Sequence, residues 1–229
     1  MYNVNNIFEG VHAVLFDMDG TLVETDIDFP LMKREMVALG VKYGLRSSEL
    51  EGLDILAVVD LTVARLEEQS RAEDARRARQ EAFEKLEQIE LAPCQDARPV
   101  DGAIELLSAL REAGIKIGIV TRNCRTGVGI SSERTGVYAD VLLTRDDVLN
   151  TKPHPDHLLQ ALDALGASPS QAMMVGDHWM DIQAGKAAGT RTVGFLRPDR
   201  QRDFFDKVQP DMVICDLGEL LDQFRRLNM

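Results

Sequence analysis

The chain has 229 residues, of which 45% are hydrophobic and 28% are charged, and its formal net charge is -12. This length allows one sizeable hydrophobic core, alone or with a smaller satellite domain. The acidic balance argues against nucleic acids and anionic membranes as partners, and an anionic substrate would need local positive charge.

Six short apolar runs predict buried strands. The first is Ala13–Phe16, and the others are Ile115–Val120, Asp140–Leu143, Ala172–Val175, Thr192–Leu196 and Met212–Cys215. Near-continuous apolar strands are typical of a sheet that is covered on both faces. Helical patterns that end at glycines lie between the later strands. This alternation predicts an α/β domain with a parallel sheet.

The segment Asp26–Ala97 breaks the alternation, because it contains no convincing strand. It opens with a helical pattern that we expect to end at Gly40, and a long charged helical run follows from Asp54 to Leu91. For that run we expect a solvent-exposed helix rather than a partner-binding coiled coil. Residues 26–97 therefore read as a helical module inserted after the first strand, and residues 1–25 and 98–229 form the α/β domain.

Polar side chains follow four of the predicted strands at the point where each strand ends. In chain order they are Asp17 with Asp19, then Thr121, Arg122 and Asn123, then Lys152, and finally Asp177 with Asp181. In open α/β sheets, ligands bind beyond the carboxyl ends of the strands. We therefore expect these side chains to meet in one site.

The carboxylates at these strand ends predict a metal site. Neighbouring carboxylates repel each other unless a cation lies between them or one of them carries a proton. Asp17 and Asp177, with Asp181 as a further candidate, offer the oxygen ligands that Mg²⁺ prefers. A metal that shields like charge would let one carboxylate attack a phosphorus atom and form an aspartyl-phosphate.

Other residues of the group suit a transferring phosphoryl group. Thr121 and Lys152 could hold its oxygens by hydrogen bond and charge. Gly20 lets the backbone approach a ligand closely, so that the loop amides add donors. Asn123 is a candidate donor in the same loop, whereas Arg122, like Arg125, either contacts substrate or forms a structural ion pair.

The aspartates also have a purely structural interpretation. An Asp at the end of a strand often caps the following helix, and both Asp177 and Asp181 stand before or within a predicted helical pattern. The joint occurrence of the polar residues at four strand ends favours the catalytic interpretation for the group as a whole.

Four motifs carry a resemblance to a known family. The stretches "DMDGTLVET", "VTRN", "TKPHP" and "GDHWMDIQAG" resemble, in order, the motifs of the haloacid dehalogenase-like superfamily, and the last two are most similar to its phosphoglycolate phosphatase-like branch. The resemblance implies a Rossmann-like core with a helical cap inserted after the first strand. It implies Asp17 as the nucleophile and Asp19 as the general acid and base. It also implies Mg²⁺ held by Asp17, the Asp19 backbone carbonyl and Asp177, with Asp181 bound through water or supporting the ligands.

The expected function is hydrolysis of a small phosphate monoester, phosphoglycolate-like or a sugar phosphate. Asp19 argues against the dehalogenases and phosphonatases of the superfamily, which need no acid at that position. A phosphosugar mutase keeps both aspartates and stays an alternative, as does a non-catalytic interaction module. The substrate, the cap residues that select it and the oligomeric state are left open.

The expected location is the cytoplasm. Cys94, Cys124 and Cys215 lie far apart, which is typical of free thiols in a reducing compartment. No run approaches the ~18 apolar residues of a membrane-spanning helix. The first ten residues show no basic segment followed by an apolar one, as a secretory signal would.

Overall fold

The computed structural model describes residues 7–227. The N-terminal stretch on which the expectation of no secretory signal rests lies mostly outside these residues. The chain divides into two compact units, which we call the core unit (Met1–Thr25 and Gln95–Met229) and the helical unit (Asp26–Cys94). Within the described residues, no helix combines the length and the apolar character needed to cross a membrane.

The core unit contains a parallel sheet, which confirms the predicted α/β class. Its six strands within the described residues run in the order β5-β4-β1-β6-β7-β8. They are β1 (Ala13–Phe16), β4 (Lys116–Val120), β5 (Val141–Leu143), β6 (Ala172–Gly176), β7 (Arg191–Phe195) and β8 (Met212–Ile214). All six predicted runs are strands; Ala13–Phe16 has the predicted ends, and in the others one or both ends are shifted by one residue. The chain builds outward from β1 first on one side and then on the other, so the order reverses beside β1.

The register of the central strands aligns their carboxyl ends. Phe16, the last residue of β1, pairs with Ile119 of β4 and with Val175 of β6. The residues that follow these three strands therefore emerge at nearly the same level. This level, next to the reversal in strand order, is where open α/β sheets bind ligands.

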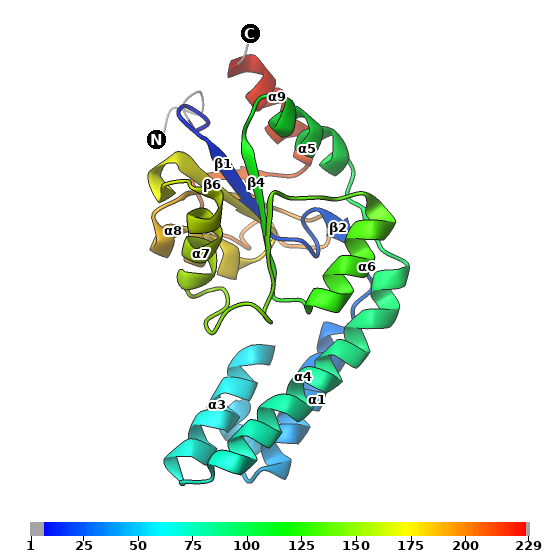
Figure 1. Ribbon diagram of the computed structural model, residues 1–229, viewed down its shortest axis with the longest axis vertical. Helices are drawn as coiled ribbons and strands as arrows, with labels where there is room; N and C mark the ends of the chain where they lie inside the picture. The colour runs from blue at the N-terminus through cyan, green and yellow to red at the C-terminus, as the bar shows by residue number, and fades with distance from the viewer. Residues whose placement is uncertain (1–6, 228–229) are drawn as a thin grey trace. The chain divides into compact units, whose positions relative to one another are not determined.

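Helices cover both faces of the sheet (Figure 1). Successive side chains of a strand point to opposite faces. Val14 and Phe16 of β1 join the apolar cluster formed with α5 (Ala103–Glu112) and α9 (Leu217–Leu227). Ala13 and Leu15 join the cluster on the other face, with α7 (Asp156–Leu165) and α8 (Trp179–Ala188). Burial on both faces explains the unbroken apolar character of these strands.

Some elements of the core unit had no clear sequence signal. Helix α6 (Arg125–Thr135) buries little beyond Gly127, Val128 and Ser131, so it has no apolar stripe to detect. A second, antiparallel sheet contains only β2 (Val23–Glu24) and β3 (Arg98–Pro99), which are too short for a periodic pattern. A 3-10 turn at Pro169–Gln171 precedes β6.

The helical unit has four helices among its residues, all of which are described. They are α1 (Phe29–Lys42), α2 (Ser47–Leu50), α3 (Ile55–Glu68) and α4 (Ala72–Gln95). The expected end of the first helix at Gly40 is wrong. Gly40 is buried within α1, where a Cβ would lie 2.7 Å from a methyl of Leu50, and the helix ends before Gly44, which has φ +103°. The long charged run is two helices, interrupted around Ser70, which has φ 60°.

Candidate active site

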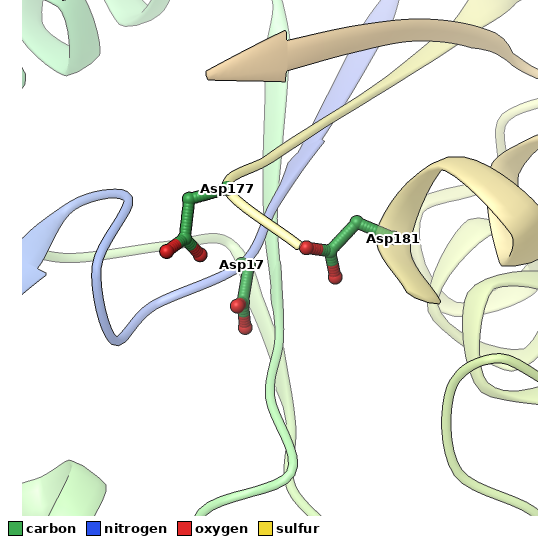
Figure 2. A group of neighbouring side chains, drawn as sticks. All are labelled: Asp17, Asp177 and Asp181. Carbon is green, nitrogen blue, oxygen red and sulfur yellow. The ribbon is translucent and has the colours of Figure 1, made fainter. Parts of the chain in front are cut away.

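Three aspartates converge at the carboxyl edge of the sheet (Figure 2). Asp17 follows β1, Asp177 follows β6, and Asp181 lies in the first turn of α8. Among the described residues these three form a group in which each offers a carboxylate oxygen within 4.8 Å of the others. The backbone N–H of Asp17 donates to the carbonyl of Val175 at 2.9 Å, which ties the first aspartate to the neighbouring strand.

Lys152 brings positive charge to this group. Its Nζ lies 2.8 Å from Oδ1 of Asp17 and 2.7 Å from Oδ1 of Asp181, and its side chain is 2% exposed. Burial alone would lower the pKa of Lys152, but the two facing carboxylates more than offset this effect and raise it. Lys152 is therefore a fixed cation that neutralises part of the carboxylate charge.

The other two carboxyl groups, those of Asp177 and Asp181, are buried. Desolvation and the charges of Asp17 and Asp181 raise the pKa of Asp177, although Arg197 and Lys152 act in the opposite direction. Desolvation also raises the pKa of Asp181. Three carboxylates around one ammonium are thus short of positive charge. This donor set suits a hard divalent cation such as Mg²⁺, whose preferred ligands are oxygens.

Asp181 has partners on both carboxylate oxygens. Oδ1 faces Lys152 at 2.7 Å, and Oδ2 accepts a hydrogen bond from the backbone N–H of His178 at 3.0 Å. The capping interaction considered from the sequence is therefore present at Asp181, which lies at the third position of α8. It coexists with membership of the carboxylate group.

Asp19 lies two residues beyond Asp17, but its side chain has different partners. Oδ1 accepts a hydrogen bond from the hydroxyl of Thr25 at 2.9 Å, and Oδ2 accepts one from the amide of Asn123 at 3.0 Å. Asp19 is not part of the three-carboxylate group among the described residues. The two aspartates of the first motif are therefore held in separate environments.

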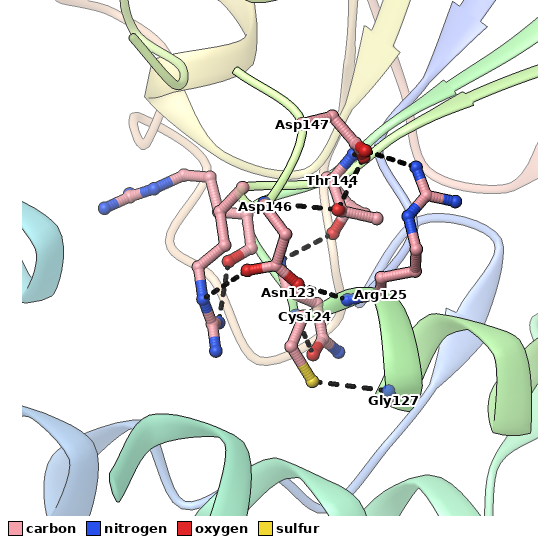
Figure 3. Close-up of polar contacts among 10 residues, drawn as sticks. Asn123, Cys124, Arg125, Gly127, Thr144, Asp146 and Asp147 are labelled. Carbon is pink, nitrogen blue, oxygen red and sulfur yellow. Dashed lines mark hydrogen bonds and ion pairs between the residues drawn. The ribbon is translucent and has the colours of Figure 1, made fainter. Parts of the chain in front are cut away.

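The loop after β4 is ordered by its own side chains (Figure 3). The hydroxyl of Thr121 accepts a hydrogen bond from the backbone N–H of Asn123 at 3.1 Å. Oδ1 of Asn123 accepts one from the backbone N–H of Cys124 at 2.7 Å, and Cys124 in turn caps α6 through its contact with Gly127. Thr121 and Asn123 are both buried, at 1% and 5% exposure.

Gly20, Arg122 and Arg125, the other predicted residues, each make a different kind of contact. Gly20 has φ +85°, and a Cβ there would lie 2.5 Å from Oδ2 of Asp177, so the loop backbone packs directly on that carboxylate. Arg122 directs a guanidinium nitrogen to the sulfur of Met180 at 2.5 Å. Arg125 forms an ion pair with Asp147, one of the two outcomes considered for it. The functional roles assigned to all of these residues stay predictions.

Several side chains around the site had no sequence signal. His157 is buried, and its Nδ1 accepts a hydrogen bond from the backbone N–H of Lys152 at 3.4 Å. Arg197 donates to the carbonyl of Gly20 at 3.0 Å and lies 3.7 Å from Glu24. A distance of 177 residues along the chain separates Arg197 from Gly20, so no local pattern could have indicated this contact.

Comparison with known proteins identifies the family. Residues 14–195 match the family model described as haloacid dehalogenase-like hydrolase. The chain belongs to this family. The resemblance seen in the four motifs is therefore confirmed, and the protein is an enzyme of the hydrolase type.

Two relatives of similar length carry the same name. Pyrophosphatase PpaX of Bacillus mycoides is 30% identical over 227 residues, with 95% of this chain and 99% of the relative covered. Pyrophosphatase PpaX of Bacillus velezensis is 31% identical over 218 residues, with 92% and 95% covered.

Solved structures share the fold. A HAD family hydrolase from Deinococcus radiodurans, with bound phosphate and sodium, has a TM-score of 0.61 at 24% identity, and the match covers 92% of this chain and 93% of that one. A predicted phosphoglycolate phosphatase from Haemophilus somnus has a TM-score of 0.60 at 21% identity and covers 93% and 97%. At these identities the likeness concerns the fold alone.

Proposed function

We propose that this protein is a Mg²⁺-dependent phosphatase that transfers the phosphoryl group of a small phosphorylated metabolite to Asp17 and then to water. The observation that carries this proposal is the separation of the two aspartates of the first motif. Asp17 lies in the three-carboxylate group on Lys152, whereas Asp19 is held apart by Asn123 and Thr25. Two identical side chains in different environments suit two different roles.

In the first step an oxygen of Asp17 attacks phosphorus and the bond between phosphorus and the leaving oxygen breaks. The electron pair stays on the leaving oxygen, which takes a proton from the carboxyl group of Asp19. Lys152 orients Asp17, because its ammonium lies 2.8 Å from Oδ1 of the attacking carboxylate. The product is an aspartyl-phosphate, a covalent intermediate that divides one difficult displacement into two easier ones.

In the second step water attacks the aspartyl-phosphate and Asp19 accepts its proton, so that phosphate leaves and Asp17 is regenerated. Thr121 and the amides of the loop around Gly20 are the proposed donors to the phosphoryl oxygens. We assign Asp17, the backbone carbonyl of Asp19 and Asp177 as the groups that hold Mg²⁺. Bound Mg²⁺ would screen the repulsion between carboxylate and phosphate and stabilise charge on the phosphoryl oxygens.

For Asp181 we propose a supporting role. Both of its oxygens have partners, Lys152 on one side and the N–H of His178 on the other. It therefore orients Lys152 and adds negative charge to the site, rather than binding the metal directly.

Inorganic pyrophosphate is the first substrate to test. The two PpaX relatives match this chain over at least 92% of its length at 30–31% identity. Pyrophosphate and a monoester such as phosphoglycolate would use the same nucleophile and differ in the leaving group. We further propose that the helical unit, inserted between β2 and β3, acts as the cap that selects among such substrates. A mutase would instead need a bisphosphate activator, and an interaction module would show no turnover.

The test is a hydrolysis assay on purified protein with pyrophosphate, phosphoglycolate and sugar phosphates. We expect EDTA to abolish turnover and Mg²⁺ to restore it. Rapid-quench trapping should capture labelled phosphoenzyme in the wild type but not in Asp17→Asn, and Asp163→Asn, at an exposed position of α7, serves as the control. Full turnover without metal, or label trapped in Asp17→Asn, would overturn the proposal.

A further inference from the structure

Arg145 is a buried arginine in the turn that follows β5. Its side chain is only 1% exposed, which is rare for a charged residue unless its donors are used. One guanidinium N–H donates to the carbonyl of Arg122 at 3.1 Å, and its backbone N–H donates to the carbonyl of Asn123 at 3.4 Å. These are the carbonyls of the two peptide groups on either side of Asn123. Arg145 therefore holds the backbone of Asn123 from both directions.

The side chain of Asn123 connects this backbone to Asp19. Oδ1 accepts a hydrogen bond from Cys124 N–H at 2.7 Å, which fixes how the amide is turned. The opposite end, Nδ2, then donates to Oδ2 of Asp19 at 3.0 Å. A displacement of the Asn123 backbone would move the donor away from Asp19, because the local hydrogen bonds carry the amide with the backbone.

The turn that carries Arg145 is itself fastened to the start of α6 (Figure 3). Asp147 accepts hydrogen bonds from the backbone N–H and the hydroxyl of Thr144, both at 2.7 Å, and pairs with the guanidinium of Arg125. Asp146 accepts from the backbone N–H of Arg125 at 2.8 Å. Arg145 directly precedes these two anchored aspartates, so its backbone is held in place where its side chain reaches the Asn123 loop.

We propose that Arg145 is a positioning residue that sets Asn123 and, through its amide, aligns the carboxyl group of Asp19 for proton transfer to the leaving group. This inference rests on the proposed function, in which Asp19 is the acid. It assigns Arg145 no contact with the substrate. The consequence is specific: loss of Arg145 should affect the reaction most where the leaving group needs a proton.

The experiment compares an alkyl phosphate with p-nitrophenyl phosphate, whose leaving group departs with little protonation. General acid-base help is usually worth ~10²–10⁴-fold. For Arg145→Met we expect kcat/KM to fall about 10- to 100-fold on the alkyl phosphate and by no more than about threefold on p-nitrophenyl phosphate. Arg145→Lys keeps one donor and should recover part of the loss. In an Asn123→Ala background, Arg145→Met should add no further difference between the two esters.

Arg134→Met, at an exposed position of α6, is the matched control and should behave as wild type. A readout independent of activity is the NMR signal of the Asn123 side-chain amide, identified by its loss in Asn123→Ala. This signal should shift in Arg145→Met and move back toward its wild-type position in Arg145→Lys.

An equal loss on both esters in folded Arg145→Met and Arg145→Lys, or an unmoved amide signal, would overturn the inference. Wild-type protein that hydrolyses neither these esters nor pyrophosphate, phosphoglycolate and sugar phosphates would contradict the proposed function instead, and the NMR comparison would still test whether Arg145 sets Asn123.

Discussion

Lys152 is the side chain on which the charge of the site depends most directly. It faces both Asp17 and Asp181 from a buried position, where water cannot replace it. Removing one partner of a buried ion pair leaves an uncompensated charge, which costs far more than losing a surface pair. A single substitution of Lys152 should therefore strongly change the charge balance of the site.

Lys152→Met should reduce turnover by ~10²–10³-fold, the usual loss for one preorganised electrostatic contact. The variant keeps most of the length of the side chain but loses the ammonium that orients Asp17. Steady-state assays with Mg²⁺ and a folded variant measure the effect, and Lys186→Met, exposed on α8, is the control. A loss below tenfold would remove Lys152 from the catalytic group.

His157 should make the fold sensitive to acid. Burial, and then the charge of Lys152, lowers its pKa from 6.5 to about 3, so the folded state keeps it neutral. Below pH 6.5 the unfolded chain binds a proton at His157 that the folded chain does not. The free energy of unfolding should therefore fall as the pH drops from 6.5 toward 3, by up to ~1.4 kcal/mol per unit from this group.

Urea unfolding at pH 7 and pH 5 tests this prediction. His157→Asn keeps an acceptor near the position of Nδ1 but has no proton to gain, so it should lose less stability between the two values than the wild type does. His154→Asn, at an exposed neighbouring position, should lose as much as the wild type. Equal losses in His157→Asn and wild type would contradict the assignment.

At the scale of elements, the loop between β1 and β2 is closed by its own backbone hydrogen bonds. The backbone N–H of Gly20 donates to Val23 at 2.8 Å, and those of Leu22 and Val23 donate to the carbonyl of Met18 at 2.9 and 3.0 Å. This closed turn places Gly20 on Asp177 while Asp17 and Asp19 precede it. The loop cannot widen without breaking these bonds.

Gly20→Ala should therefore cost activity as well as stability. Its φ of +85° disfavours any side chain, and a Cβ would lie 2.5 Å from Asp177. Gly114→Ala is the matched control, because Gly114 has φ +76° and nothing lies within 4 Å of the added atom. Both variants should lose ~1–2 kcal/mol from the left-handed backbone. Only Gly20→Ala should also lower turnover and weaken Mg²⁺ binding. Similar activity in both variants would contradict the packing argument.

At the scale of the whole molecule, the proposed metal belongs to the core unit alone. Its proposed ligands, Asp17, the backbone carbonyl of Asp19 and Asp177, follow β1 and β6, all within that unit. A ligand that binds only the folded state stabilises it by about 2.7 kcal/mol at 100 times its Kd. For a unit of this size, that stabilisation corresponds to a rise in Tm of about 5–10 °C.

Saturating Mg²⁺ should thus raise the Tm of the core unit, and the shift should vanish in Asp177→Asn. Differential scanning calorimetry measures it, with Asp163→Asn as the control that keeps the shift. The transition of the helical unit, if it is separate, should not move. A full shift in Asp177→Asn would place the metal elsewhere.

The sequence by itself determined the class of fold and the points where chemistry could occur. Apolar runs such as Ala13–Phe16 are local signals of burial on both faces, and the polar residues that follow them need no tertiary information to be noticed. Helix α6 escaped the same reasoning because it buries only a few small residues. The end of the first helix was wrongly predicted at Gly40, because a glycine can be required for close packing as well as for a helix end.

Only the tertiary structure decided which of these residues meet. Asn123 and Asp19 are 104 residues apart, and Thr21 and Asp177, whose side chains also meet, are 156 apart. Strand order and register bring such pairs together, and these depend on packing across the whole sheet rather than on any local pattern. The different partners of Asp17 and Asp19, and the burial of Arg145 and His157, follow from that packing. The motif thus names the proposed reacting groups, and the fold determines their surroundings, because burial and hydrogen bonding are properties of the assembled sheet.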